Sequence, residues 1–233
     1  MLLNVCADYD QLSRLAANLI CDLVRSKPAS VLCLASGHTP LGTFRYLAEA
    51  AKSGSVDLSQ CHFVGLDEWA GIAPETEGSC RYFLDVYLFN LLNVNPEHIL
   101  FFNGTASDLK MECEKMDATI ARLGGLDLML VGIGMNGHIG MNEPGTPWNF
   151  RSHVSQLHET TRVVGQKYFS EKTALDKGIT LGMQYLKEAR LPLLMASGEG
   201  KAAVVRQALE GEVTEVFPAS IFQQLPHGVV MLD

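Results

Sequence analysis

Cationic residues are scarce in this chain of 233 residues. Lys and Arg together number 18, against 26 Asp and Glu, which gives a formal net charge of −8 at pH 7. Proteins that bind nucleic acids usually present a broad basic surface, so this balance argues against a nucleic-acid partner. An acidic protein can still bind a small anion where a few cations and backbone N–H groups converge.

Long hydrophobic runs are also missing. No apolar stretch approaches the roughly 20 residues that a membrane-spanning helix needs, so we expect no membrane partner. The first residues, MLLNVCADYDQLSR, lack the basic region and long apolar stretch of a secretory signal peptide. We therefore expect a cytoplasmic protein.

Motifs that bind cofactors are absent as well. There is neither a Walker loop nor a G-x-G-x-x-G sequence, so a nucleotide cofactor is not indicated. The cysteines form no C-x-x-C pair, and most lie inside or beside apolar runs, which favours free, mostly buried thiols in a reducing compartment. We expect no cofactor and no metal. The six cysteines are Cys6, Cys21, Cys33, Cys61, Cys80 and Cys113.

Short apolar runs that alternate with amphipathic segments dominate the rest of the chain. Hydrophobic residues make up 47% of it, enough for a sizeable core. Alternating strands and helices predict an α/β fold: one doubly wound, Rossmann-like domain over residues 1–233, with a mostly parallel sheet and helices on both faces. The expected strands are 31–34, 62–66, 99–102, 126–133, 191–196 and 229–232. The expected helices are 9–25, 41–52, 79–92, 107–123 and 201–209.

Ligands of such sheets bind beyond the carboxyl ends of the strands, and polar segments follow four of the expected strands. The first is Ser36-Gly37-His38-Thr39, ahead of Pro40 at the start of a helix. Its hydroxyls and exposed N–H groups suit an anion, although an ordinary capped strand-to-helix turn would have the same composition.

The second segment carries the adjacent carboxylates Asp67 and Glu68. A carboxylate at a strand end can act as a general base, or it can cap the next helix. Because neighbouring side chains of an extended segment point to opposite sides, we expect only one of the pair to face a ligand.

The third segment, residues 132–145, follows the longest expected strand and is rich in glycine. Asn136, His138, Asn142 and Glu143 lie within eight residues of one another. A histidine held by Glu143 would have a defined tautomer and orientation, which suits proton transfer. A metal site is the rival interpretation, but His138 and Glu143 are too few ligands for zinc.

The fourth segment, residues 197–201, again opens a helix and contains Lys201. The helix dipole does not favour a lysine at this end, so a phosphate-binding role is a better explanation than a solvated surface position.

These segments resemble the glucosamine-6-phosphate deaminase/isomerase family, both in their residues and in their order along the chain. Related 6-phosphogluconolactonases tend to have arginine after the DE pair and a DGHTASLFP-like third loop, whereas this chain has Trp69 and NGHIGMNEPG. The matching stretches are ASGHTPL at 35–41, LDEWAGI at 66–72, GIGMNGHIGMNEPG at 132–145, TTRVV at 160–164 and SGEGK at 197–201.

The resemblance implies roles for the matching positions. Asp67 would move the C2 proton, and His138 would open the sugar ring with the help of Asn136 and Glu143. Many relatives have aspartate at the position of Asn136, so its replacement leaves Glu143 as the expected carboxylate partner of His138. The substrate phosphate would bind Ser36, Gly37, His38, Thr39, Lys201 and Lys167, the last at a position where many relatives carry arginine.

The expected function is that of an amino-sugar 6-phosphate deaminase/isomerase, which forms a ketose 6-phosphate and ammonia. Flanking sequence and Trp69, where the glucosamine branch usually has tyrosine, resemble the galactosamine-6-phosphate branch, whose product would be tagatose 6-phosphate rather than fructose 6-phosphate. The alternatives are a lactonase-like hydrolase, an isomerase that does not deaminate, and a non-catalytic sugar-phosphate-sensing module. We expect a monomer or a small homo-oligomer.

Overall fold

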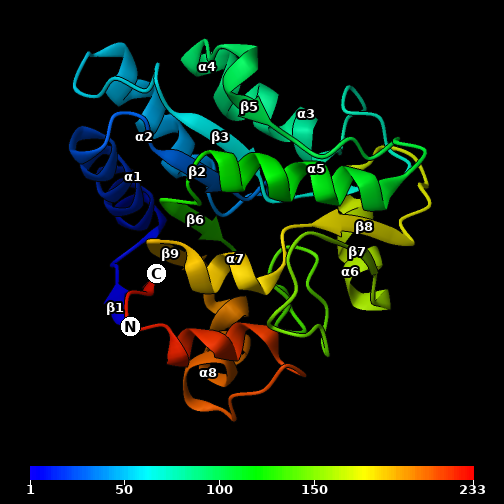
Figure 1. The fold of residues 1–233 in the computed structure, drawn as a ribbon. Helices are drawn as coiled ribbons and strands as arrows, with labels where there is room; N and C mark the ends of the chain where they lie inside the picture. Colours follow the sequence, from blue (N-terminus) through cyan, green and yellow to red (C-terminus); the bar gives the residue numbers. More distant parts are fainter.

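Seven parallel strands form the central sheet of the computed structural model, which describes residues 1–233 (Figure 1). The first and last strands pair directly, so the two ends of the chain lie close together. In spatial order the strands are β1 (Leu2–Val5), β10 (Val229–Leu232), β9 (Leu191–Ala196), β6 (Leu128–Val131), β2 (Val31–Leu34), β3 (His62–Gly65) and β5 (Ile99–Leu100).

The strand order reverses between β2 and β6. From β2 the chain moves outward to β3 and β5, then returns to the other side of β2 as β6 and continues outward to β9 and β10. The loops that follow β2 and β6 consequently leave the sheet in different directions, which opens a crevice at its carboxyl edge. The predicted doubly wound fold, with a mostly parallel sheet, is confirmed.

Eight α-helices surround the sheet (Figure 1). The predicted helix over 79–92 is interrupted, because a π-helical turn over Asp85–Phe89 joins α3 to α4. No helix has the length and apolarity required to cross a membrane. The helices are α1 (Tyr9–Ser26), α2 (Leu41–Lys52), α3 (Cys80–Leu84), α4 (Asn90–Leu92), α5 (Leu109–Arg122), α6 (Glu159–Gly165), α7 (Met183–Glu188) and α8 (Ala202–Glu210).

A second, antiparallel sheet was not predicted. It consists of β4 (Asp67–Trp69), β8 (Lys177–Thr180) and β7 (His153–Gln156), with β8 in the middle. These strands are short and largely polar, so the sequence contains no apolar run from which they could be predicted. The Asp67–Trp69 segment, predicted as an extended segment after a strand, is itself a strand of this second sheet.

The core divides in the same way as the sheets. A cluster of 56 buried residues packs around the parallel sheet. A cluster of six, including Trp69, Met141 and Phe169, lies beside the small sheet. All six cysteines are free and buried, as predicted from their positions in apolar runs.

The carboxylate of Glu68 connects the small sheet to helix α3. It is 1% exposed and accepts backbone N–H groups from Trp69 at 2.8 Å, Cys80 at 3.0 Å and Arg81 at 2.9 Å. Two of these donors belong to the first turn of α3, whose N–H groups have no partner within the helix. Burial raises the pKa of Glu68 to about 7, and the three N–H groups oppose that rise.

We expect Glu68→Ala to destabilise the fold by about 3 kcal/mol, because it strands three backbone N–H groups that have lost their acceptor. Glu77→Ala, an exposed change in the same connection, should alter stability by less than about 0.5 kcal/mol. Urea denaturation of both variants at pH 5 measures the difference, because Glu68 is then protonated in the folded state and its removal relieves little buried charge. Equal stability of the two would show that Glu68 does not support this junction.

Candidate active site

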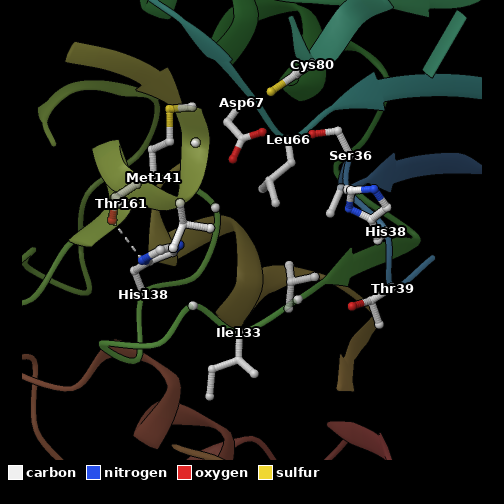
Figure 2. Close-up of a pocket in the computed structure, with 18 of the residues that line it drawn as sticks. Ser36, His38, Thr39, Leu66, Asp67, Cys80, Ile133, His138, Met141 and Thr161 are labelled. Atoms are coloured by element: carbon white, nitrogen blue, oxygen red, sulfur yellow. Dashed lines mark hydrogen bonds between the residues drawn. The ribbon is translucent and has the colours of Figure 1, made fainter. Parts of the chain in front are cut away.

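A cavity of about 220 Å³ opens at the carboxyl ends of β2 and β6 (Figure 2). Its walls come from five parts of the chain that are distant in sequence. They are the loop after β2, strand β4 with Cys80, the glycine-rich loop after β6, the segment from Thr160 to Tyr168, and Lys201. Three of the four polar segments identified in the sequence contribute several residues each, and the fourth contributes Lys201.

Asp67 faces this cavity and Glu68 does not, as the alternation of an extended segment predicts. Asp67 is 8% exposed, and its carboxylate points into the cavity beside the sulfur of Cys80 (Figure 2). Burial raises the pKa of Asp67 to about 6, and a hydrogen bond from the Cys80 thiol opposes the rise. A carboxylate with this pKa is ionised at neutral pH and is a stronger base than an exposed aspartate.

A relay of three side chains holds His138 on the opposite wall. Nδ1 of His138 lies 2.6 Å from Oδ1 of Asn136, and Nδ2 of Asn136 donates to Oε2 of Glu143 at 2.9 Å. The second oxygen of Glu143 accepts the backbone N–H of His158 at 3.2 Å. Thr161 also contacts Nδ1 of His138, at 3.2 Å (Figure 2).

The expectation that Glu143 holds His138 directly is corrected by this geometry. The two side chains are 3.8 Å apart, beyond hydrogen-bond distance, and Asn136 lies between them. The amide of Asn136 can connect the two side chains because it both donates and accepts hydrogen bonds, whereas an ionised carboxylate only accepts them. Since Nδ2 of Asn136 turns to Glu143, its Oδ1 accepts Nδ1–H of His138, which leaves Nε2 as the basic nitrogen.

Two features keep His138 neutral and in place. Burial lowers the pKa of its imidazole, and the charges of Lys201 and His158 lower it further, while Glu143 opposes them. A Cβ at Gly134 would overlap the imidazole ring, so only glycine permits this close approach.

The backbone N–H groups of the loop after β2 are free, which suits the anion-binding role predicted for this loop. None of the backbone N–H groups of residues 36–39 is bonded to another protein group. Gly37 adopts a φ of 108°, which an L side chain rarely tolerates and which shapes the turn. Ser36, Gly37, His38 and Thr39 all line the cavity. Unpaired N–H groups just before a helix are suited to a phosphate.

Of the two predicted phosphate-binding lysines, the structure brings only Lys201 to the cavity. Its Nζ donates to the carbonyl oxygen of Ile133 at 2.6 Å, and burial lowers its pKa. Lys167 is exposed and is not among the lining residues. It lies in the turn that directs the next side chain, Tyr168, inward, because successive side chains of a tight turn point in different directions.

Several lining residues were given no role in the site by sequence reasoning, although Trp69 and Met141 stand in stretches of the family resemblance. Cys80, Trp69 and Met141 form an apolar wall near Asp67, and Thr161 and Tyr168 come from the α6 segment. The resemblance did include TTRVV, so Thr161 stood in a flagged stretch without an assigned role. Tyr168 had no signal at all.

A doubly wound sheet with a buried carboxylate, an oriented histidine and a loop of free N–H groups at its switch point is the arrangement of an α/β enzyme. The family model described as Glucosamine-6-phosphate isomerases/6-phosphogluconolactonase matches residues 7–231. The chain belongs to this family, and the resemblance read from its motifs is confirmed.

Curated relatives match over nearly the full chain. The glucosamine-6-phosphate deaminase of Lachnoclostridium phytofermentans is 42% identical over 219 residues, covering 94% of this chain and 93% of the relative. That of Bacillus velezensis is 38% identical over 229 residues, covering 98% of this chain and 95% of the relative.

Solved structures separate two degrees of similarity. A monomeric glucosamine-6-phosphate deaminase superposes with a TM-score of 0.96 at 36% identity, covering 100% of this chain and 97% of the other. The 6-phosphogluconolactonase from Trypanosoma brucei has a TM-score of 0.80 at 19% identity, covering 100% of this chain and 95% of the other. The second likeness shows the fold alone.

We expect Asp67→Asn to stabilise the protein by about 3 kcal/mol at pH 8, since ionising a carboxyl whose pKa rises from 3.8 to about 6 penalises the folded state by that amount. The unfolded state ionises first, so the gain should shrink as the pH falls through 6 and vanish below the unfolded pKa. Denaturation at pH 8 and pH 4 measures it.

The control for this prediction is Asp57→Asn. Asp57 is exposed, and hydrogen bonds from Ser59 lower its pKa, so its replacement should give no gain at pH 8. A pH-independent gain at position 67 would mean that the burial of charge is not its cause.

Proposed function

We propose that this enzyme converts a hexosamine 6-phosphate and water to the ketose 6-phosphate and ammonia. The observation that carries the proposal is the placement of Asp67 and His138 on facing walls of one cavity that also contains an anion loop (Figure 2). The names of relatives between 35% and 42% identical to this chain, all glucosamine-6-phosphate deaminases, support it.

Binding begins with the phosphate. The unpaired N–H groups of residues 36–39 and the ammonium of Lys201 surround it. A phosphate held far from the reacting carbons fixes the position of the whole sugar, so the acid and base groups meet their atoms without further ordering.

His138 catalyses the opening of the sugar ring. Its unprotonated Nε2 accepts the proton of the C1 hydroxyl, and the imidazole returns a proton to the ring oxygen as the C1–O5 bond breaks. The product is the open-chain aldehyde. The Glu143–Asn136 relay fixes the imidazole throughout, because the Nδ1 proton stays engaged with Asn136.

Isomerisation is the work of Asp67. Its carboxylate removes the C2 proton, the electron pair forms the C1=C2 bond, and the C1 carbonyl oxygen takes up a proton to give an enolamine. Asp67 then returns its proton to C1, which leaves an imine at C2. Water then adds to C2, the C–N bond breaks, and ammonia leaves with a proton. The ketose 6-phosphate remains, and all steps use positioned acid and base groups.

Two substrates that differ only in configuration at C4 are candidates: glucosamine 6-phosphate and galactosamine 6-phosphate. The names of the relatives favour glucosamine 6-phosphate, with fructose 6-phosphate as product. The flanking motifs and Trp69, which lines the cavity, favour galactosamine 6-phosphate, with tagatose 6-phosphate as product. Because more of the chain supports the first candidate, we place glucosamine 6-phosphate ahead.

An ammonia-release assay with both hexosamine 6-phosphates and with 6-phosphogluconolactone tests the proposal. We expect ammonia and a ketose 6-phosphate from at least one hexosamine, hydrolysis of the lactone to be absent, and Asp67→Asn to lower kcat at least ~100-fold. Lactone hydrolysis without ammonia release would replace deamination with the lactonase alternative.

The relay predicts non-additive losses. Asn136→Leu breaks both of its hydrogen bonds and should lower kcat about 100-fold. Adding Glu143→Gln to that variant should cost little more, because Glu143 orients His138 through Asn136 and that orientation is already lost; only its direct charge effect on the pKa of His138 remains. Steady-state kinetics of the two single variants and the double variant decide. If the fold-loss in kcat of the double variant equals the product of the two single losses, Glu143 acts independently of Asn136.

A further inference from the structure

Tyr168 places a hydroxyl in the cavity that the proposed reaction leaves unused. Its ring stacks on His38, with centroids 5.4 Å apart and an interplanar angle of 19°. The residue lines the cavity from the turn that follows α6. Stacking on one side and the backbone turn on the other fix the direction of the ring, so the position of the hydroxyl is defined.

The hydroxyl lies beside the anion loop, in the cavity that the proposed base also lines. A Cβ at Gly37 would be 3.4 Å from it. Burial raises the pKa of Tyr168. The phenol therefore stays protonated and can donate a hydrogen bond.

No protein group uses this hydroxyl. Among the hydroxyl side chains that line the cavity outside the anion loop, Thr161 contacts His138 and Thr160 contacts His158. The Tyr168 hydroxyl takes part in none of the hydrogen bonds of the protein. The residue is partly buried and lines the cavity, so its free hydroxyl is available to a ligand group or to water.

The dimensions of a hexosamine 6-phosphate indicate which group of the ligand would meet the Tyr168 hydroxyl. If C2 lies at Asp67 and the phosphate on C6 lies at residues 36–39, then C3, C4 and C5 span the interval between them. Tyr168 lines the same cavity, with its hydroxyl next to Gly37. The two hexosamine 6-phosphates differ only in the direction of the C4 hydroxyl, so a single oriented donor is enough to distinguish them.

We propose that Tyr168 is a specificity-determining residue whose hydroxyl donates a hydrogen bond to the C4 hydroxyl of the bound sugar. This inference rests on the proposed function. It accounts for discrimination between the epimers by a residue that stands outside every motif of the family resemblance.

The test compares kcat/KM for glucosamine 6-phosphate and galactosamine 6-phosphate in the wild type and in Tyr168→Phe. Phenylalanine keeps the stack on His38 and removes only the oxygen. We expect kcat/KM for the preferred epimer to fall about tenfold and that for the other to change less than about twofold. The ratio between the epimers should therefore collapse.

Tyr87→Phe is the matched control, because Tyr87 is 44% exposed, its hydroxyl makes no protein hydrogen bond, and it lies outside this cavity. It should leave both values unchanged. A wild-type ratio near one, or an equal loss for both epimers in Tyr168→Phe, overturns the assignment while ammonia release continues. Absence of ammonia release from both epimers by the wild type overturns the proposed function itself.

Discussion

The carboxylate of Glu68 is the interaction on which the site depends. By accepting three backbone N–H groups it joins strand β4 to the start of helix α3 and settles which side of the strand faces inward. Because the strand alternates, Asp67 must then point the other way, into the cavity. The two interpretations of the acidic pair were thus not rivals: one carboxylate caps a helix, and the other is available for chemistry. A structural requirement at one position sets the geometry of a functional group at the next.

A second buried network orients the other wall. Glu143, anchored by the backbone of His158, fixes the amide of Asn136, which in turn fixes the tautomer of His138. An asparagine in place of aspartate removes a negative charge beside the imidazole and keeps the acceptor. Burial therefore lowers the pKa of His138 with less electrostatic opposition than an adjacent aspartate would supply. The same burial raises the pKa of Asp67, so the cavity brings a neutral base and a strengthened carboxylate base to one substrate.

Much of this architecture could be predicted from the sequence, and the elements and residues that were predicted wrongly or missed have physical explanations. The inner strands of the parallel sheet are continuous apolar runs, because both of their faces are buried, and such runs are easily recognised. The edge strand β1 is largely exposed and was not predicted. Strand β7 reads His-Val-Ser-Gln and strand β8 Lys-Gly-Ile-Thr, so pairing across the small sheet, rather than hydrophobicity, makes them strands. Lys167 was expected at the phosphate through resemblance, but the turn at 166–168 exposes it and directs Tyr168 inward.

Local patterns determined the fold class, the polar loop at 36–39 after a strand and the chemical types of Asp67 and His138, because each of these depends on neighbours in the chain. Tertiary structure alone decided the partners. Asn136 rather than Glu143 contacts His138, Glu68 reaches a helix twelve residues away, and Lys201 meets Ile133 across 68 positions. Hydrogen-bond distances and burial are properties of packed chains, and no spacing along a sequence specifies which donor arrives at which acceptor when several are within reach.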